Sequence, residues 1–135
     1  MTLDITPLTN AVTRLTEGWT RYQADTTDIQ IRDGLIQRFE FTYELAHKTL
    51  KRFLENVSPT PGEFDLVNFQ HLIRSANEQG LLLNDWLAWK GYRDMRTKTS
   101  HTYEEECARE VVAGIPSFID EVRYMREQLH RRLAQ

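Results

Sequence analysis

Residues 37–55, QRFEFTYELAHKTLKRFLE, place apolar side chains at steps of three and four, the spacing of one face of an α-helix. The pattern extends in both directions and predicts a helix over about residues 28–56. Phe41 and Leu45 broaden the stripe, so we expect this helix to contact neighbours on more than one side. It should end within VSPTPGEF, residues 57–64, because the prolines and the glycine cannot continue a helix. The main stripe consists of Ile31, Leu35, Phe39, Tyr43, Ala46, Leu50, Phe53 and Val57.

The same helical spacing recurs in the rest of the chain, and no alternating strand pattern of useful length is present. It predicts helices over about residues 7–22, 65–79 and 85–98, and a last one from about residue 102 to the C-terminus. Thr6 and Asn84 are expected N-caps, Gly80 an expected helix stop, and Pro116 an expected kink in the last helix. We therefore expect an all-α fold, an antiparallel four- to five-helix bundle, as a single domain over residues 1–135.

Composition limits the classes of protein to which the chain can belong. Forty per cent hydrophobic and 27% charged residues are typical of a globular domain. Cys107 is the only cysteine, so neither an internal disulfide nor a multi-thiolate metal site can form. The sequence shows no membrane span and no signal peptide, and we expect a cytoplasmic protein. A net charge of −3 argues against a general polyanion binder, so any nucleic-acid contact should be local.

One local excess of positive charge runs from Lys90 to Lys98 and overlaps the stretch RTKTSHTY, residues 96–103. Arg96 should lie in the last turn of one helix, and Thr102–Glu105 fits a capping box that would start the next, with Tyr103 as its first helical residue. Arginine offers a planar fork for phosphate, and histidine exchanges protons near neutral pH, so Arg96 and His101 could cleave RNA without metal. A polar turn between two helices is the alternative, and local spacing alone favours it.

A metal site is a weaker alternative on the long helix. Glu40 and Glu44 share one helix face, and His47 completes an E-x-x-H motif of the kind that binds metal in di-iron bundles. A second such motif is missing, so we expect no metal and no cofactor, and Glu44 should instead pair with Lys48 at i,i+4. Phosphate-binding loops, dinucleotide fingerprints and hydrolase elbows are also missing from the sequence.

Two segments together resemble a known family. Residues 37–55 resemble the signature helix of the nucleotidyltransferase substrate-binding proteins, and residues 89–106, WKGYRDMRTKTSHTYEEE, resemble their second signature, including its Arg-x4-His-x-Tyr core. These proteins are all-helical partners of minimal nucleotidyltransferases and belong to the HEPN group, whose members commonly form homodimers. Where the signatures usually have Trp and Asn, this chain has His47 and Thr97.

The resemblance implies roles for particular residues. In active HEPN ribonucleases the arginine and histidine line a cleft at the dimer interface, which implies that Arg96 and His101 are catalytic or contact RNA. In the HepT-like toxin branch the partner nucleotidyltransferase can adenylylate the tyrosine, which implies Tyr103 as a modification site. Supporting substrate contacts are expected from neighbours of this motif, namely Arg93, Thr97, Lys98 and Ser100.

Two functional hypotheses follow. The first is a homodimeric substrate-binding subunit that presents a nucleotide or RNA to a separately encoded minimal nucleotidyltransferase, since the chain carries no acidic metal-binding strand motif of its own. The second is a metal-independent ribonuclease toxin of a toxin–antitoxin pair, which uses Arg96 and His101 and is silenced by adenylylation of Tyr103.

Overall fold

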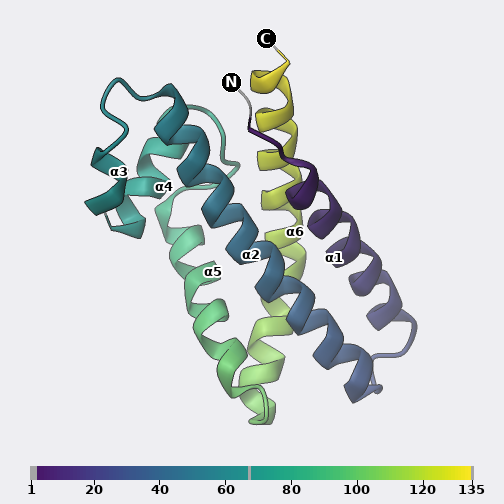
Figure 1. Ribbon diagram of the computed structural model, residues 1–135. Coiled ribbons are helices and arrows are strands. Elements are labelled where there is room, and N and C mark those ends of the chain that lie inside the picture. Colours follow the sequence, from purple (N-terminus) through teal and green to yellow (C-terminus); the bar gives the residue numbers. More distant parts are fainter. Residues whose placement is uncertain (1–2, 67, 135) are drawn as a thin grey trace.

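The computed structural model describes residues 3–66 and 68–134, and all regular structure in that part of the chain is helical (Figure 1). This confirms the predicted all-α bundle. The helix predicted over residues 28–56 is also confirmed, because it begins after Asp28, whose side chain accepts a hydrogen bond from the Ile31 N–H at 3.1 Å. The elements are α1 (Thr6–Ala24), α2 (Ile29–Val57), α3 (Glu63–Leu66), α4 (Phe69–Glu78), α5 (Trp86–Lys98), a short 3₁₀ helix η1 (Thr99–His101) and α6 (Glu105–Leu133).

The long helices α1, α2, α5 and α6 form the body of the bundle, and each runs opposite to the one before it (Figure 1). Helix α1 contacts α2 and α6, and α5 contacts the same two helices from the other side. The shorter α3 and α4 lie beside the C-terminal half of α2 (Figure 1). The turn from α5 through η1 into α6 lies at the opposite end of the molecule from the chain termini, so residues 96–103 form one tip of the bundle.

A cluster of buried aromatic rings fixes how α2, α5 and α6 sit against one another. The Phe118 ring of α6 lies 4.8 Å from Phe39 of α2 and 5.1 Å from Tyr92 of α5, measured between ring centroids. Trp89, fully buried on α5, packs against Tyr92 at 5.4 Å. Edge-on contacts of this kind add about 0.5–1.5 kcal/mol each to the burial of the rings. The face of α5 that carries these rings determines where Arg96 lies, one turn further along.

The loop before α5 is held by a buried carboxylate. Glu121 of α6 has no exposed surface, and it accepts hydrogen bonds from the backbone N–H groups of Leu83 at 2.6 Å and Asn84 at 3.1 Å. Burial raises the pKa of Glu121, and the backbone hydrogen bonds oppose that change. Because Asn84 is held in this way, Asp85 caps α5 in its place, accepting from the Leu87 N–H. The expected Asn84 cap was therefore wrong by one residue.

Two other boundaries differ from the prediction. The helix expected over residues 65–79 is divided into α3 and α4, and Asn68 starts α4 by accepting a hydrogen bond from the His71 N–H at 2.9 Å. Val67, part of the predicted helix, lies outside the described residues. Thr6 is the first residue of α1 and not its cap, because Ile5 occupies the N-cap. Gly80 confirms the expected stop after α4, with a left-handed φ of 76°.

Helix α2 contacts neighbours on more than one side, as predicted, but Phe41 of its broadened stripe lies at the surface. Phe41 is 55% exposed, because α1, α5 and α6 cover the main stripe and leave this position at the surface. Pro116 lies inside α6, which continues on both sides of it, and the kink expected there stays a prediction. Among the described helices, none has an apolar stretch long enough to cross a membrane.

Candidate functional site

Arg96 lies in the last turn of α5, as predicted, and its guanidinium is held by α2. Its Nε and Nη2 donate to Glu44 Oε1 at 3.2 and 2.5 Å, and Glu40 Oε1 lies 3.3 Å from Nη2. On the other side, Nη1 donates to Thr99 Oγ1 at 3.1 Å. The hydrogen bond to Glu44 raises the pKa of Arg96, so the guanidinium is a permanent, oriented positive charge.

This arrangement does not use every donor of the arginine. A guanidinium has five N–H groups, two of them on each terminal nitrogen. Nη1 makes one described hydrogen bond, to Thr99, and therefore has a second N–H for another acceptor. Two carboxylates face one cation here, so the cluster as a whole is not positive. It orients Arg96 more than it attracts an anion.

His101 and Tyr103 form a separate, exposed pair at the tip of the bundle. His101 ends η1, and its Nδ1 lies 3.4 Å from the Tyr103 hydroxyl oxygen. Tyr103 is 80% exposed, in the turn before α6. The described contacts of Arg96 do not include His101, although only residues 97–100 separate the two in sequence. The structure therefore gathers the predicted residues at one tip but in two groups.

The capping box predicted at Thr102–Glu105 was wrong. Helix α6 begins at Glu105 with Glu104 as its N-cap and no side-chain cap hydrogen bond, so Tyr103 precedes the helix. The carboxylate that should reach back to Thr102 is bound elsewhere, since Arg32 of α2 donates to both Glu105 oxygens at 2.6 and 3.0 Å. A bidentate arginine–carboxylate ion pair is stronger than a single capping hydrogen bond, so Glu105 binds Arg32.

The four supporting residues do not surround Arg96. Thr97 is exposed and its hydroxyl donates to the Arg93 carbonyl one turn back, while Ser100 is exposed on η1. Lys98 pairs with Glu110 of α6, and this contact raises the pKa of its ammonium group. Arg93 stacks over the rings of Trp86 and Phe69, at 5.2 and 5.8 Å from their centroids. Lys98 and Arg93 thus already have partners within the protomer.

Comparison with known proteins agrees with this fold. A family model described as "Nucleotidyltransferase substrate binding protein like" matches residues 3–131. The chain belongs to this family. A Haemophilus influenzae relative named "Probable ribonuclease HepT" is 41% identical over 99 residues, which cover 73% of this chain and 67% of the relative.

A solved structure extends the likeness to almost the whole chain. It is HI0074 from Haemophilus influenzae, described as revealing the fold of a substrate binding domain of a nucleotidyltransferase. The TM-score is 0.87 at 32% sequence identity, covering 94% of this chain and 99% of HI0074. The predicted family and its helical fold are thereby confirmed.

Sequence reasoning missed the contact of Glu40 and Glu44 with Arg96. Glu44 was expected to pair with Lys48, but its carboxylate binds Arg96 of α5 instead. The i,i+4 spacing of the two acids on one helix face was a visible signal, yet it did not show which cation would meet them. Among the described residues, no group of three His, Cys, Asp or Glu side chains could hold a metal ion, and Glu40, Glu44 and His47 do not form one.

Proposed function

We propose that this chain is the helical substrate-binding subunit of a separately encoded minimal nucleotidyltransferase, and that it acts in the cytoplasm as a homodimer of one-domain protomers. Its substrate, RNA or a nucleotide, binds at the tip that carries Arg96 and His101. The observation that carries this proposal is the guanidinium of Arg96, fixed by Glu44 and Thr99 and retaining an N–H on Nη1.

The chemistry of the tip suits a phosphate-containing substrate. Arginine binds phosphate oxygens with a planar set of donors, and the exposed imidazole of His101 offers ring nitrogens that can hydrogen-bond to the same substrate. Glu40 and Glu44 hold the arginine in one orientation, which lowers the cost of ordering it when substrate binds. Since no described contact joins Arg96 to His101 in one protomer, a homodimer that places two copies of the motif around one cleft would complete the site.

The need for a catalytic partner follows from the fold. The described chain is a helical bundle without the strand-borne acidic residues that would hold the metal for nucleotide transfer. Family membership and the description of HI0074 as the fold of a nucleotidyltransferase substrate-binding domain support the choice of partner.

A second candidate function is a metal-independent ribonuclease toxin of a toxin–antitoxin pair. Arg96 would stabilise charge at the scissile phosphate and His101 would transfer the proton. The observation that favours it is the exposed Tyr103 hydroxyl 3.4 Å from His101. Transfer of AMP from ATP to that oxygen, with release of pyrophosphate, would place a nucleotide over the imidazole and block it. The 41% identical relative named as a probable ribonuclease supports the same candidate.

One experiment separates these functions. Purified wild type, His101→Ala and Arg96→Gln are incubated in EDTA with single-stranded RNA or with a nucleotide. Binding of each ligand and cleavage of the RNA are measured. His130→Ala, which removes an exposed imidazole from the last turn of α6, is the matched control. Binding without cleavage supports the subunit, whereas cleavage that only His101→Ala and Arg96→Gln lose supports the ribonuclease. Neither function survives if wild type shows no binding of RNA or nucleotide and no cleavage.

The modification has its own measurement. The chain is co-expressed with a nucleotidyltransferase of demonstrated activity, and the intact mass is determined for wild type and Tyr103→Phe. An AMP-sized increment on wild type alone is expected. If wild type stays unmodified, Tyr103 is not the modification site that the second candidate function requires.

A further inference from the structure

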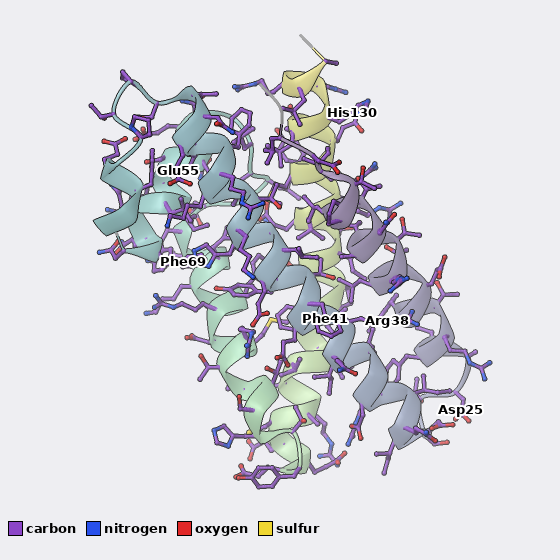
Figure 2. The ribbon with its side chains drawn as sticks, viewed as in Figure 1. Asp25, Arg38, Phe41, Glu55, Phe69 and His130 are labelled. Atoms are coloured by element: carbon purple, nitrogen blue, oxygen red, sulfur yellow. The ribbon has the colours of Figure 1, made fainter. Side chains whose placement is uncertain are left out.

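A groove of about 430 Å³ lies between α1 and α2, and the exposed Phe41 is part of its lining. We define the α1–α2 groove by five of its lining residues: Arg14 of α1, and Arg38, Phe41, Glu44 and Lys48 of α2. Its volume falls within the range of sites that hold small organic molecules. Figure 2 shows Phe41 and Arg38 close together on the part of α2 that faces the viewer.

The α1–α2 groove is locally positive in a chain with a net charge of −3. Arg14, Arg38 and Lys48 are all exposed, and Glu44 is the only acid among the described lining residues. That acid is already engaged by Arg96. Arg38 reaches from α2 to α1, where its Nη1 donates to the Arg14 carbonyl at 2.7 Å. The charge that remains along the groove is positive, and it favours an anionic ligand.

Phe41 adds an aromatic surface to these cations. It is 55% exposed although it belongs to the apolar pattern of α2. An exposed ring beside several cations is the combination with which proteins bind single-stranded nucleic acid, because bases stack on the ring and phosphates contact the cations. Such binding is tolerant of sequence, since every base has a stacking face.

We propose that the α1–α2 groove binds a segment of single-stranded RNA, with a base stacked on Phe41 and phosphates contacting Arg14, Arg38 and Lys48. The proposal rests on the proposed function and names its substrate class. Glu44 connects the two regions, because it lines the groove and also accepts hydrogen bonds from Arg96. RNA bound in the groove would therefore pass beside the side chain that holds the arginine.

A second copy of the chain fits the α1–α2 groove less well than RNA does. Closed homodimers are mostly formed by two-fold contacts, in which the same patch of each protomer meets its copy. Such a contact would bring the cations of one groove against those of the other, and like charges at an interface are unfavourable. The phosphates of RNA remove this repulsion.

Binding of a fluorescent oligouridylate of about 12 nucleotides tests the proposal, because single-strand sites of this kind span about 4–16 nucleotides. All variants carry His101→Ala so that no RNA is cut, and anisotropy is followed across a salt series. Arg14→Gln and Lys48→Gln should each weaken binding and reduce the slope of log affinity against log salt by about 0.7. Arg123→Gln, an exposed cation of α6 outside the groove, should leave the slope unchanged.

The ring is tested with a matched series. Phe41→Ala and Phe41→Leu should both weaken binding, by roughly 5- to 100-fold, whereas Phe41→Trp should preserve it, since only the tryptophan can stack. Retained binding in Phe41→Leu would overturn the stacking. Circular dichroism and sedimentation velocity accompany each variant, and a change from dimer to monomer in Phe41→Ala would show that a second copy covers the ring, which also overturns the proposal.

The outcome also separates this inference from the proposed function. If Arg96→Gln weakens binding but the groove variants do not, the groove is excluded and the proposed site stands. If the groove variants weaken binding but Arg96→Gln does not, the groove stands and the proposed site fails. If neither the His101→Ala parent nor wild type binds the oligonucleotide at low salt, and wild type does not cleave it, both are overturned.

Discussion

The contact between Arg96 and Glu44 joins α5 to α2 at the proposed site, and its strength can be measured with a double-mutant cycle. Wild type, Arg96→Ala, Glu44→Ala and the double variant are compared. In the structure, two N–H groups of Arg96 reach one Glu44 oxygen, at 2.5 and 3.2 Å. The side chains are 28% and 44% exposed, so the pair is only partly protected from water.

The expected magnitude follows from this partial exposure. A fully exposed ion pair contributes about 0.2–1 kcal/mol, while a hydrogen bond to a charged group contributes about 1.5–3 kcal/mol. With solvent screening taken into account, we expect a coupling energy near the top of the exposed range, about 1 kcal/mol. Arg96→Ala should cost more than Glu44→Ala, because Glu40 remains as a partner in the second case, whereas the first leaves two carboxylates facing each other.

The denaturant should be urea, because guanidinium chloride is a salt and would screen the ion pair being measured. Unfolding in urea is followed by circular dichroism. The coupling should shrink when about 1 M salt is added, because the pair is reached by solvent. Arg131 and Glu127, an exposed i,i+4 pair on α6, provide the matched cycle and should couple by no more than about 0.5 kcal/mol. If Arg96 and Glu44 couple no more strongly than this control pair, the claim that α2 holds the arginine is wrong.

Three further predictions concern the fold. A Cβ on Gly114 would lie 2.7 Å from Met95 Cε, so Gly114→Ala should be better tolerated with Met95→Ala than alone, by about 0.5–3 kcal/mol of coupling in urea unfolding. Gly80→Ala should destabilise by about 1–2 kcal/mol because φ is 76° there, whereas Gly91→Ala, in a helix with open space around it, should stabilise by up to about 1 kcal/mol. Burial lowers the pKa of His47 below its ordinary 6.5, so on acidification the unfolded chain binds the proton before the folded chain does. The urea midpoint should therefore fall as the pH drops from about 7 through 6.5 toward the lowered pKa of the folded state. His47→Gln should weaken this pH dependence.

Much of the fold could be predicted because the information is local. The stripe from Ile31 to Val57 repeats at helical spacing, and the prolines after it stop the helix, so α2 was placed within one residue at each end. The errors fell where a residue's role depends on a distant partner. Asn84 looked like an N-cap, but the buried Glu121 holds its backbone N–H and Asp85 caps the helix.

The candidate site shows the same division. The sequence pointed to Arg96, His101 and Tyr103 as one motif, and to its place between two helices. It did not show that the motif separates into two groups, with Arg96 turned to α2 and His101 beside Tyr103. The capping box failed for a similar reason, because Glu105 binds an arginine 73 residues away in sequence.

What the sequence by itself determined is the four long helices, their order, and the family to which the two signature segments belong, since helical periodicity acts over a few residues and each signature is a continuous segment. Only the tertiary structure decided which face of each helix meets which neighbour. Packing of Phe39, Tyr92 and Phe118 sets the register of α2 against α5 and α6, and that register places Glu44 against Arg96, 52 residues apart in sequence. Packing of the helices decides which surface side chains meet a partner and which stay exposed. The contact of Arg96 with Glu44 and the exposure of Phe41 could therefore not be read from the sequence.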